Sequence, residues 1–85
     1  MREFKYVITD EVGIHARPVG LLVQEAKKFS STIMFVKGEK SAKATSLMKL
    51  MGMGIVKGDE VTIQVEGDDE DAAAAAIEEF MKANF

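Results

Sequence analysis

The alternation of apolar and polar residues predicts β-strands in several parts of this chain. Apolar side chains recur at every second position of residues 4–8 and 60–66, which is typical of strands with one buried and one exposed face. Residues 32–37 are rich in β-branched and aromatic side chains and predict a third strand. Residues 37–40 then form a glycine-containing turn, and residues 41–44 are expected to return as a short strand.

Three other segments predict helices. Residues 16–29 and 46–53 carry apolar side chains at helical spacing. The segment 67–71, which holds four acidic residues, caps a final helix that runs to about residue 84. The apolar positions of these strands and helices are expected to face the core, and they are Phe4, Tyr6, Ile8, Val19, Leu22, Val23, Ala26, Phe29, Leu50, Met53, Val61, Ile63, Val65, Ala73, Ala76, Ile77, Phe80 and Met81.

The resulting order of elements is β-α-β-β-α-β-α. Three helices can cover one face of a four-stranded, mainly antiparallel sheet and leave its other face to solvent, so the predicted fold class is α+β. The chain has 85 residues and shows neither an internal repeat nor a domain boundary. We therefore expect a single domain over residues 1–85.

Composition narrows the function classes. The chain has no cysteine, which excludes disulfides and thiolate metal sites. No apolar run is long enough to span a bilayer, and the charged residues 1–5 lack the apolar stretch of a signal peptide. These features predict a cytoplasmic protein without membrane insertion. The net charge of −3 argues against nucleic-acid binding.

The segment 13–18, Gly-Ile-His-Ala-Arg-Pro, contains the only histidine and the only proline of the chain. Proline is tolerated in the first turn of a helix and disfavoured deeper in, so Pro18 predicts a helix start near His15 or Ala16. Free N–H groups and the positive end of the helix dipole favour an anion there. The Arg17 guanidinium is suited to phosphate oxygens. An imidazole at this place is a candidate phosphoryl acceptor.

Each candidate has a structural alternative. His15 could serve only as a helix N-cap, although Ser, Thr, Asp or Asn is the usual residue there. Ser46 suits the N-cap of its own helix, and a phosphate on its hydroxyl is also compatible with a helix start. Gly20 inside a helix indicates close packing on a neighbouring element or contact with a partner. The acidic residues 68–71 are explained by a helix start, and no metal site is expected.

The short helix 46–53 is rich in methionine. Methionines at helical spacing often belong to the core, and Leu50 with Met53 can supply the buried face. One short helix cannot bury every side, so some apolar surface is expected at Leu47, Met48 and Met51. Adaptable methionine side chains suit a surface that docks several partners in turn.

The segment 13–18 resembles the active-site signature of HPr, the histidine-containing phosphocarrier family of the bacterial phosphoenolpyruvate-dependent sugar phosphotransferase system. Residues 46–51 resemble the regulatory serine of this family and the hydrophobic patch after it. Residues 54–58 and 66–70 also fall where the family has similar residues, and the resemblance covers essentially the whole chain. It implies an open-faced β-sandwich with strands in the order 1-4-2-3.

The resemblance also implies a function. Such a protein is a phosphoryl carrier and not an enzyme: His15 accepts a phosphoryl group from phosphorylated enzyme I and passes it to enzyme IIA domains for sugar uptake. The N–H groups of Ala16 and Arg17 and the Arg17 guanidinium hold the phosphoryl oxygens, and no metal or other cofactor is needed. The partner-binding residues would be Leu47, Met48, Met51, Gly20 and Lys49.

Regulation is implied at Ser46. In the family this serine is the target of the HPr kinase/phosphorylase, and the modified form acts with a catabolite control protein in carbon catabolite repression. The added charge would repel an acidic partner and attract one that presents arginines. We expect a monomer.

Two other functions compete with a phosphocarrier. One is a regulatory binding module in which phosphoserine and the apolar patch matter and His15 is only a cap. The family also includes regulatory paralogues that lack the active-site histidine, and the presence of His15 argues against that branch. The other is a small ligand- or RNA-binding domain. The negative charge and the shortage of aromatic residues on the sheet argue against it.

Overall fold

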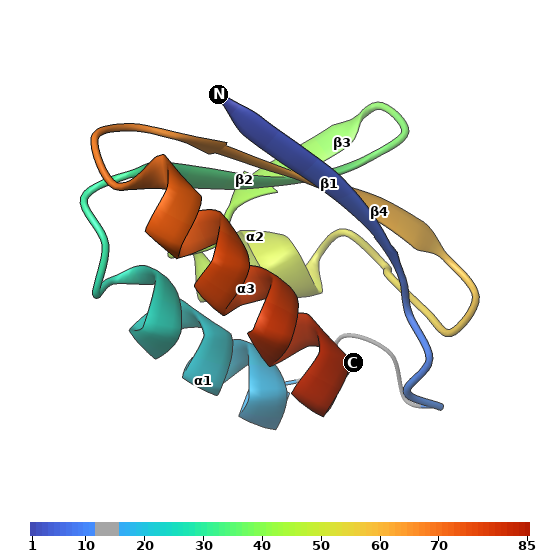
Figure 1. Ribbon diagram of the computed structural model, residues 1–85. Helices are drawn as coiled ribbons and strands as arrows, with labels where there is room; N and C mark the ends of the chain where they lie inside the picture. The colour runs from blue at the N-terminus through green and yellow to red at the C-terminus, as the bar shows by residue number, and fades with distance from the viewer. Residues whose placement is uncertain (12–15) are drawn as a thin grey trace.

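The computed structural model describes residues 1–11 and 16–85, and in this part of the chain it confirms the predicted order of elements. The strands are β1 (Arg2–Val7), β2 (Thr32–Lys37), β3 (Lys40–Lys43) and β4 (Glu60–Glu66), and the helices are α1 (Ala16–Ala26), α2 (Leu47–Met51) and α3 (Glu70–Asn84). The strands form one antiparallel sheet in the order β1-β4-β2-β3. The helices lie together on one face of this sheet, so the fold is an open-faced α+β sandwich (Figure 1). None of the described helices is long and apolar enough to cross a membrane.

The register of the strands places the apolar side chains on one face. Ile63 of β4 pairs with Phe4 on one side and with Phe35 on the other. Ile63 and Phe35 are fully buried. Because side chains alternate between the two faces of a sheet, the neighbouring pair Glu3 and Gln64 lies on the opposite, open face. There Gln64 Nε2 donates a hydrogen bond of 2.9 Å to Glu3 Oε2.

The predicted core is largely confirmed. Most of the expected positions are buried, and Phe4, Tyr6, Val23, Phe29 and Phe80 are partly buried and packed against the core. One position was wrong: Ala74 is buried in α3, whereas Ala76 is only half-buried.

Several predicted ends of elements were also wrong. The helix predicted over 16–29 ends at Ala26. Lys27 N still donates to Val23 O, four residues back, but Lys28 N donates to Glu25 O and Phe29 N to Ala26 O, three residues back. This tightens the main chain into a turn. The other differences are small: β1 covers Arg2–Val7, β3 covers Lys40–Lys43, and α2 covers only Leu47–Met51.

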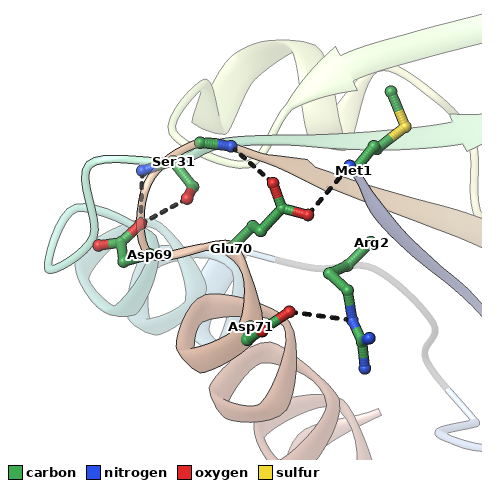
Figure 2. A network of polar contacts seen from close by, with 7 residues as sticks. Met1, Arg2, Ser31, Asp69, Glu70 and Asp71 are labelled. Atoms are coloured by element: carbon green, nitrogen blue, oxygen red, sulfur yellow. Dashed lines mark hydrogen bonds and ion pairs between the residues drawn. The ribbon is translucent and has the colours of Figure 1, made fainter.

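The side chain of Asp69 joins the loop before β2 to the start of α3 (Figure 2). Its carboxylate accepts hydrogen bonds of 2.9 Å from the main-chain N–H groups of Ser30 and Ser31, and another from the Ser31 hydroxyl. The Ser31 hydroxyl, with these N–H groups, lowers the pKa of Asp69. Asp69 stands at the N-cap position of α3 but makes no side-chain capping bond. The predicted start of this helix within the segment 67–71 is confirmed, but the Asp69 carboxylate bonds across the loop and not to its own helix.

Glu70 extends the same network toward the first strand (Figure 2). Its Oε1 accepts a hydrogen bond from Gly67 N at 3.4 Å, and its Oε2 lies 3.0 Å from the amino group of Met1. Arg2 Nε lies 3.4 Å from Asp71 Oδ1. Asp69, Glu70 and Asp71 thus stand at the helix start and make contacts with other segments. No group of three or more metal-ligating side chains is found in the described residues.

Candidate functional site

The first turn of α1 presents its polar groups to solvent. Ala16 and Arg17 are exposed, whereas Pro18 and Val19 are buried and fix the helix to the core. A proline in the first turn interrupts no intrahelical hydrogen bond, because the N–H groups there have no partner within the helix. The helix start at Ala16 agrees with the prediction made from Pro18. His15, the predicted phosphoryl acceptor, lies outside the described residues.

Arg17 lies beside a shallow depression of about 380 Å³ between α1 and the end of α3. The depression is lined by Asp10, Arg17, Pro18, Leu21, Ala83 and Asn84. Arg17 forms no ion pair with any carboxylate of the described residues. The guanidinium is therefore available to an anion that reaches this end of α1.

Residues 9 and 10, on the other side of the undescribed segment, are fixed to the end of α3. The main-chain N–H groups of Thr9 and Asp10 donate to the main-chain oxygen of Phe85 at 2.5 and 2.8 Å, and the Thr9 hydroxyl donates to the same oxygen at 2.9 Å. Phe85 is buried, and its ring centroid lies 6.3 Å from that of Phe80. The segment that contains His15 is thus bordered on both sides by residues that are tied to the core.

Helix α2 packs against α1 and exposes the apolar side chains expected of it. Leu47, Met48 and Met51 are 37%, 80% and 41% exposed, whereas Leu50 and Met53 are buried. Exposure of this apolar surface is therefore confirmed. Lys49 is also exposed on α2.

Other apolar residues are exposed without having been predicted so, among them one on α1 and one in the loop after α2. Leu21 of α1 is 48% exposed, and Val56, in the loop after α2, is 54% exposed. A signal existed for each: Leu21 falls outside the helical stripe that includes Leu22, and Val56 stands in a glycine-rich loop without alternation. An apolar residue off the expected stripe indicates exposed surface.

Ser46 stands at the N-cap position of α2, with φ −109° and ψ 92°. Its main-chain oxygen accepts a hydrogen bond from Leu50 N at 3.0 Å, but its side chain makes no capping hydrogen bond. The predicted N-cap position of Ser46 is therefore confirmed, but its hydroxyl does not cap the helix. This half-buried hydroxyl is not committed to the helix end.

Gly20 is half-buried within α1. A methyl group added at its Cα would meet no atom of the described residues within 4 Å beyond the adjoining helix backbone. Close packing of Gly20 on a neighbouring element of the described fold was therefore wrong. Contact of Gly20 with a partner stays a prediction.

Comparison with known proteins identifies a family whose sequences are similar to this chain. The sequence model of the family described as PTS HPr component phosphorylation site matches residues 2–83. A phosphocarrier protein HPr of Mycoplasma capricolum is 47% identical over 81 residues, which cover 95% of this chain and 91% of the relative.

Solved structures agree with the sequence comparison. The histidine-containing phosphocarrier protein of a Mycoplasma matches with a TM-score of 0.93 and 45% identity, over 96% of this chain and 93% of that chain. An HPr dimer from Thermoanaerobacter tengcongensis matches with a TM-score of 0.77 and 40% identity, over 98% of this chain and 95% of that chain. The similarity thus extends to the fold and to nearly the whole sequence.

Proposed function

Because this chain belongs to the HPr family of phosphocarrier proteins of the phosphotransferase system, we propose that it accepts a phosphoryl group on His15 from phosphorylated enzyme I and passes it to enzyme IIA domains. It is a carrier and not an enzyme. The observation that carries the proposal is the exposed first turn of α1, where Arg17 has no carboxylate partner among the described residues and follows the only histidine by two positions.

The proposed transfer needs one nucleophile and several anion-binding groups. A ring nitrogen of His15 attacks the phosphorus atom, so that a P–N bond forms while the bond between phosphorus and the donor breaks. The first N–H groups of α1, at Ala16 and Arg17, and the Arg17 guanidinium stabilise the negative charge on the phosphoryl oxygens. An open site allows the same group to leave for the next acceptor. The carrier supplies these groups without a metal ion.

The docking surface for enzyme I and the IIA domains is proposed on α1 and α2. Its residues are Leu47, Met48, Met51, Gly20 and Lys49. The exposed methionines support this proposal, since an apolar surface of flexible side chains can adapt to partners of different shape. Because α2 packs against α1, a partner that docks on α2 can also reach α1.

Regulation is proposed at Ser46, by an HPr kinase/phosphorylase and with a catabolite control protein as partner of the modified form. The uncommitted hydroxyl of Ser46 supports this proposal. A phosphate there adds about −1.5 to −2 charges at pH 7. It would change the surface that partners of α2 encounter.

We expect the carrier to act as a monomer in the cytoplasm. The absence of cysteine is compatible with a reducing compartment. Since several structural relatives are described as dimers, sedimentation equilibrium of the purified chain is the appropriate measurement. A mass of one chain at micromolar concentration is expected, and a stable dimer would contradict it.

A relay assay tests the proposed function. Enzyme I, phosphoenolpyruvate, Mg²⁺ and a IIA domain are mixed with and without this chain, and the phosphate on the IIA domain is measured. We expect the IIA domain to be phosphorylated only when the chain is present, and the His15→Ala variant to be inactive. If His15→Ala relayed phosphate as well as the unaltered chain, the proposed role of His15 would be wrong.

A further inference from the structure

A groove of about 390 Å³ lies between β3 and α2, directly beside Ser46. The groove is lined by Met34, Ser41, Ala42, Lys43, Ser46 and Lys49. Two lysines thus line it together with two serines, and none of the lining residues is acidic. This local positive charge contrasts with the net charge of −3 for the whole chain.

Neither lysine of the groove is neutralised by the described fold. Lys43 and Lys49 are exposed, and no carboxylate of the described residues forms an ion pair with either of them. Four other lysines do have such a partner, and they are Lys5, Lys28, Lys37 and Lys57. The groove therefore combines two ammonium groups that lack a counterion with a serine hydroxyl that makes no capping bond.

We propose that Lys43 and Lys49 bind the phosphate of phosphorylated Ser46, and that this contact withdraws Lys49 from the docking surface. The inference rests on the regulatory phosphorylation proposed above. A phosphoserine brings about −1.5 to −2 charges, and two ammonium groups in one groove can compensate most of them. Modification then acts in two ways, because it adds an anion and removes a cation that a partner would meet.

This mechanism differs from simple repulsion of an acidic partner by a free phosphate. If repulsion alone operated, phosphorylation would slow transfer by the same factor with or without the Lys49 charge. If Lys49 is withdrawn, loss of its charge already produces part of the effect, so phosphorylation of the Lys49→Gln variant adds less. The two changes are then non-additive, as expected for groups in direct contact.

The contact is tested on chain in which phosphoserine is inserted at position 46 during translation, so the result does not depend on any kinase. A ³¹P NMR titration measures the pKa of this phosphate. We expect a pKa about 0.5–1 unit below the ordinary value of about 6, raised again in Lys43→Gln and Lys49→Gln. Lys40→Gln is the matched control, because Lys40 lies on the same strand but does not line the groove.

An ordinary phosphate pKa in the chain with all its lysines, or an equal response to Lys40→Gln, would overturn the contact. Transfer from phosphorylated enzyme I is then compared for the unaltered chain, Lys49→Gln, the phosphoserine form and the combination of both. Full additivity of the two slowing factors would overturn the withdrawal of Lys49. Failure of His15 as acceptor would abolish transfer in all four proteins but leave the ³¹P result unchanged, and failure of a kinase to modify Ser46 would affect neither measurement.

Discussion

Arg17 is the described residue on which the proposed chemistry most depends. It is exposed in the first turn of α1 and forms no ion pair with a described carboxylate. A planar guanidinium can donate two parallel hydrogen bonds to phosphoryl oxygens, which an ammonium group cannot reproduce. Its contribution should therefore appear in the rate of transfer and not in the stability of the fold.

Arg17→Gln should reduce phosphoryl transfer from enzyme I by about 10²-fold, the usual effect of losing one donor that stabilises developing charge. Arg2→Gln is the matched control, since it removes the other arginine, whose contact with Asp71 is exposed. Rapid-quench kinetics with phosphorylated enzyme I measures both variants, and thermal unfolding confirms that both fold. Equal transfer rates for the two variants would contradict the proposed role of Arg17 in phosphoryl binding.

Gly67 provides a residue-scale test of the fold. Its φ is +153°, and a Cβ at this position would lie 2.6 Å from the Ser31 Cα. Gly67→Ala should therefore lower the free energy of unfolding by about 1–3 kcal/mol, through backbone strain and a clash with main-chain atoms. Urea unfolding measures the change, and an unaltered midpoint would contradict the described approach of the two loops.

In helix α1, a glycine-to-alanine substitution should change the free energy of unfolding in the opposite direction. Gly20→Ala adds a methyl group where no described atom beyond the adjoining helix backbone lies within 4 Å. It should raise the free energy of unfolding by about 0.5–1 kcal/mol, because alanine loses less conformational entropy in a helix. Transfer from phosphorylated enzyme I should nevertheless become slower if Gly20 contacts the partner. A destabilised variant would contradict the packing, and a stabilised variant with unchanged kinetics would remove Gly20 from the docking surface.

The type and order of the elements could be predicted from the sequence because they depend on local periodicity. Alternation over 60–66 identified β4 at its observed bounds, and Pro18 marked the start of α1. The end of α1 was missed because Phe29 continues the apolar spacing of the helix while its main chain has already turned. The strand order followed only from the family resemblance, since pairing of β1 with β4 joins residues about sixty positions apart.

Features of the candidate site that depend on local sequence could also be predicted, whereas contacts between distant residues could not. Exposure of Met48 was predicted because one short helix cannot bury all of its apolar side chains. The role of Asp69 was missed because its partners Ser30 and Ser31 lie 39 and 38 positions away, and an aspartate at a helix start suggests a local cap. Lys43 and its proximity to Lys49 and Ser46 were missed for the same reason, because the groove exists only once β3 and α2 are packed together.

At the scale of the whole molecule, three carboxylates connect distant segments. Asp59 Oδ2 lies 2.7 Å from Lys37 Nζ. Asp69 accepts a hydrogen bond from the Ser31 hydroxyl, and Glu70 forms an ion pair with the amino group of Met1. These contacts are the first cause of a lowered pKa for each carboxyl group. A lowered pKa in the folded state stabilises the fold above the ordinary carboxyl pKa of about 4, and this contribution is lost as the pH falls through the folded-state values.

The melting temperature should therefore change little between pH 7 and about pH 5 and should fall at lower pH. Asp69→Asn should lower the melting temperature at neutral pH and make its fall in acid less steep, because one of the three contributions is already absent. Circular dichroism melts from pH 2 to pH 7 measure both curves. Parallel curves for the unaltered chain and the variant would contradict the role assigned to Asp69.

The central claim is that this molecule carries a phosphoryl group on His15. The most direct test is incubation with enzyme I, Mg²⁺ and phosphoenolpyruvate, followed by intact mass measurement before and after acid treatment. We predict a gain of one phosphate that is lost in acid and absent in His15→Ala. No gain of phosphate, or an acid-stable phosphate that persists in His15→Ala, would contradict the account.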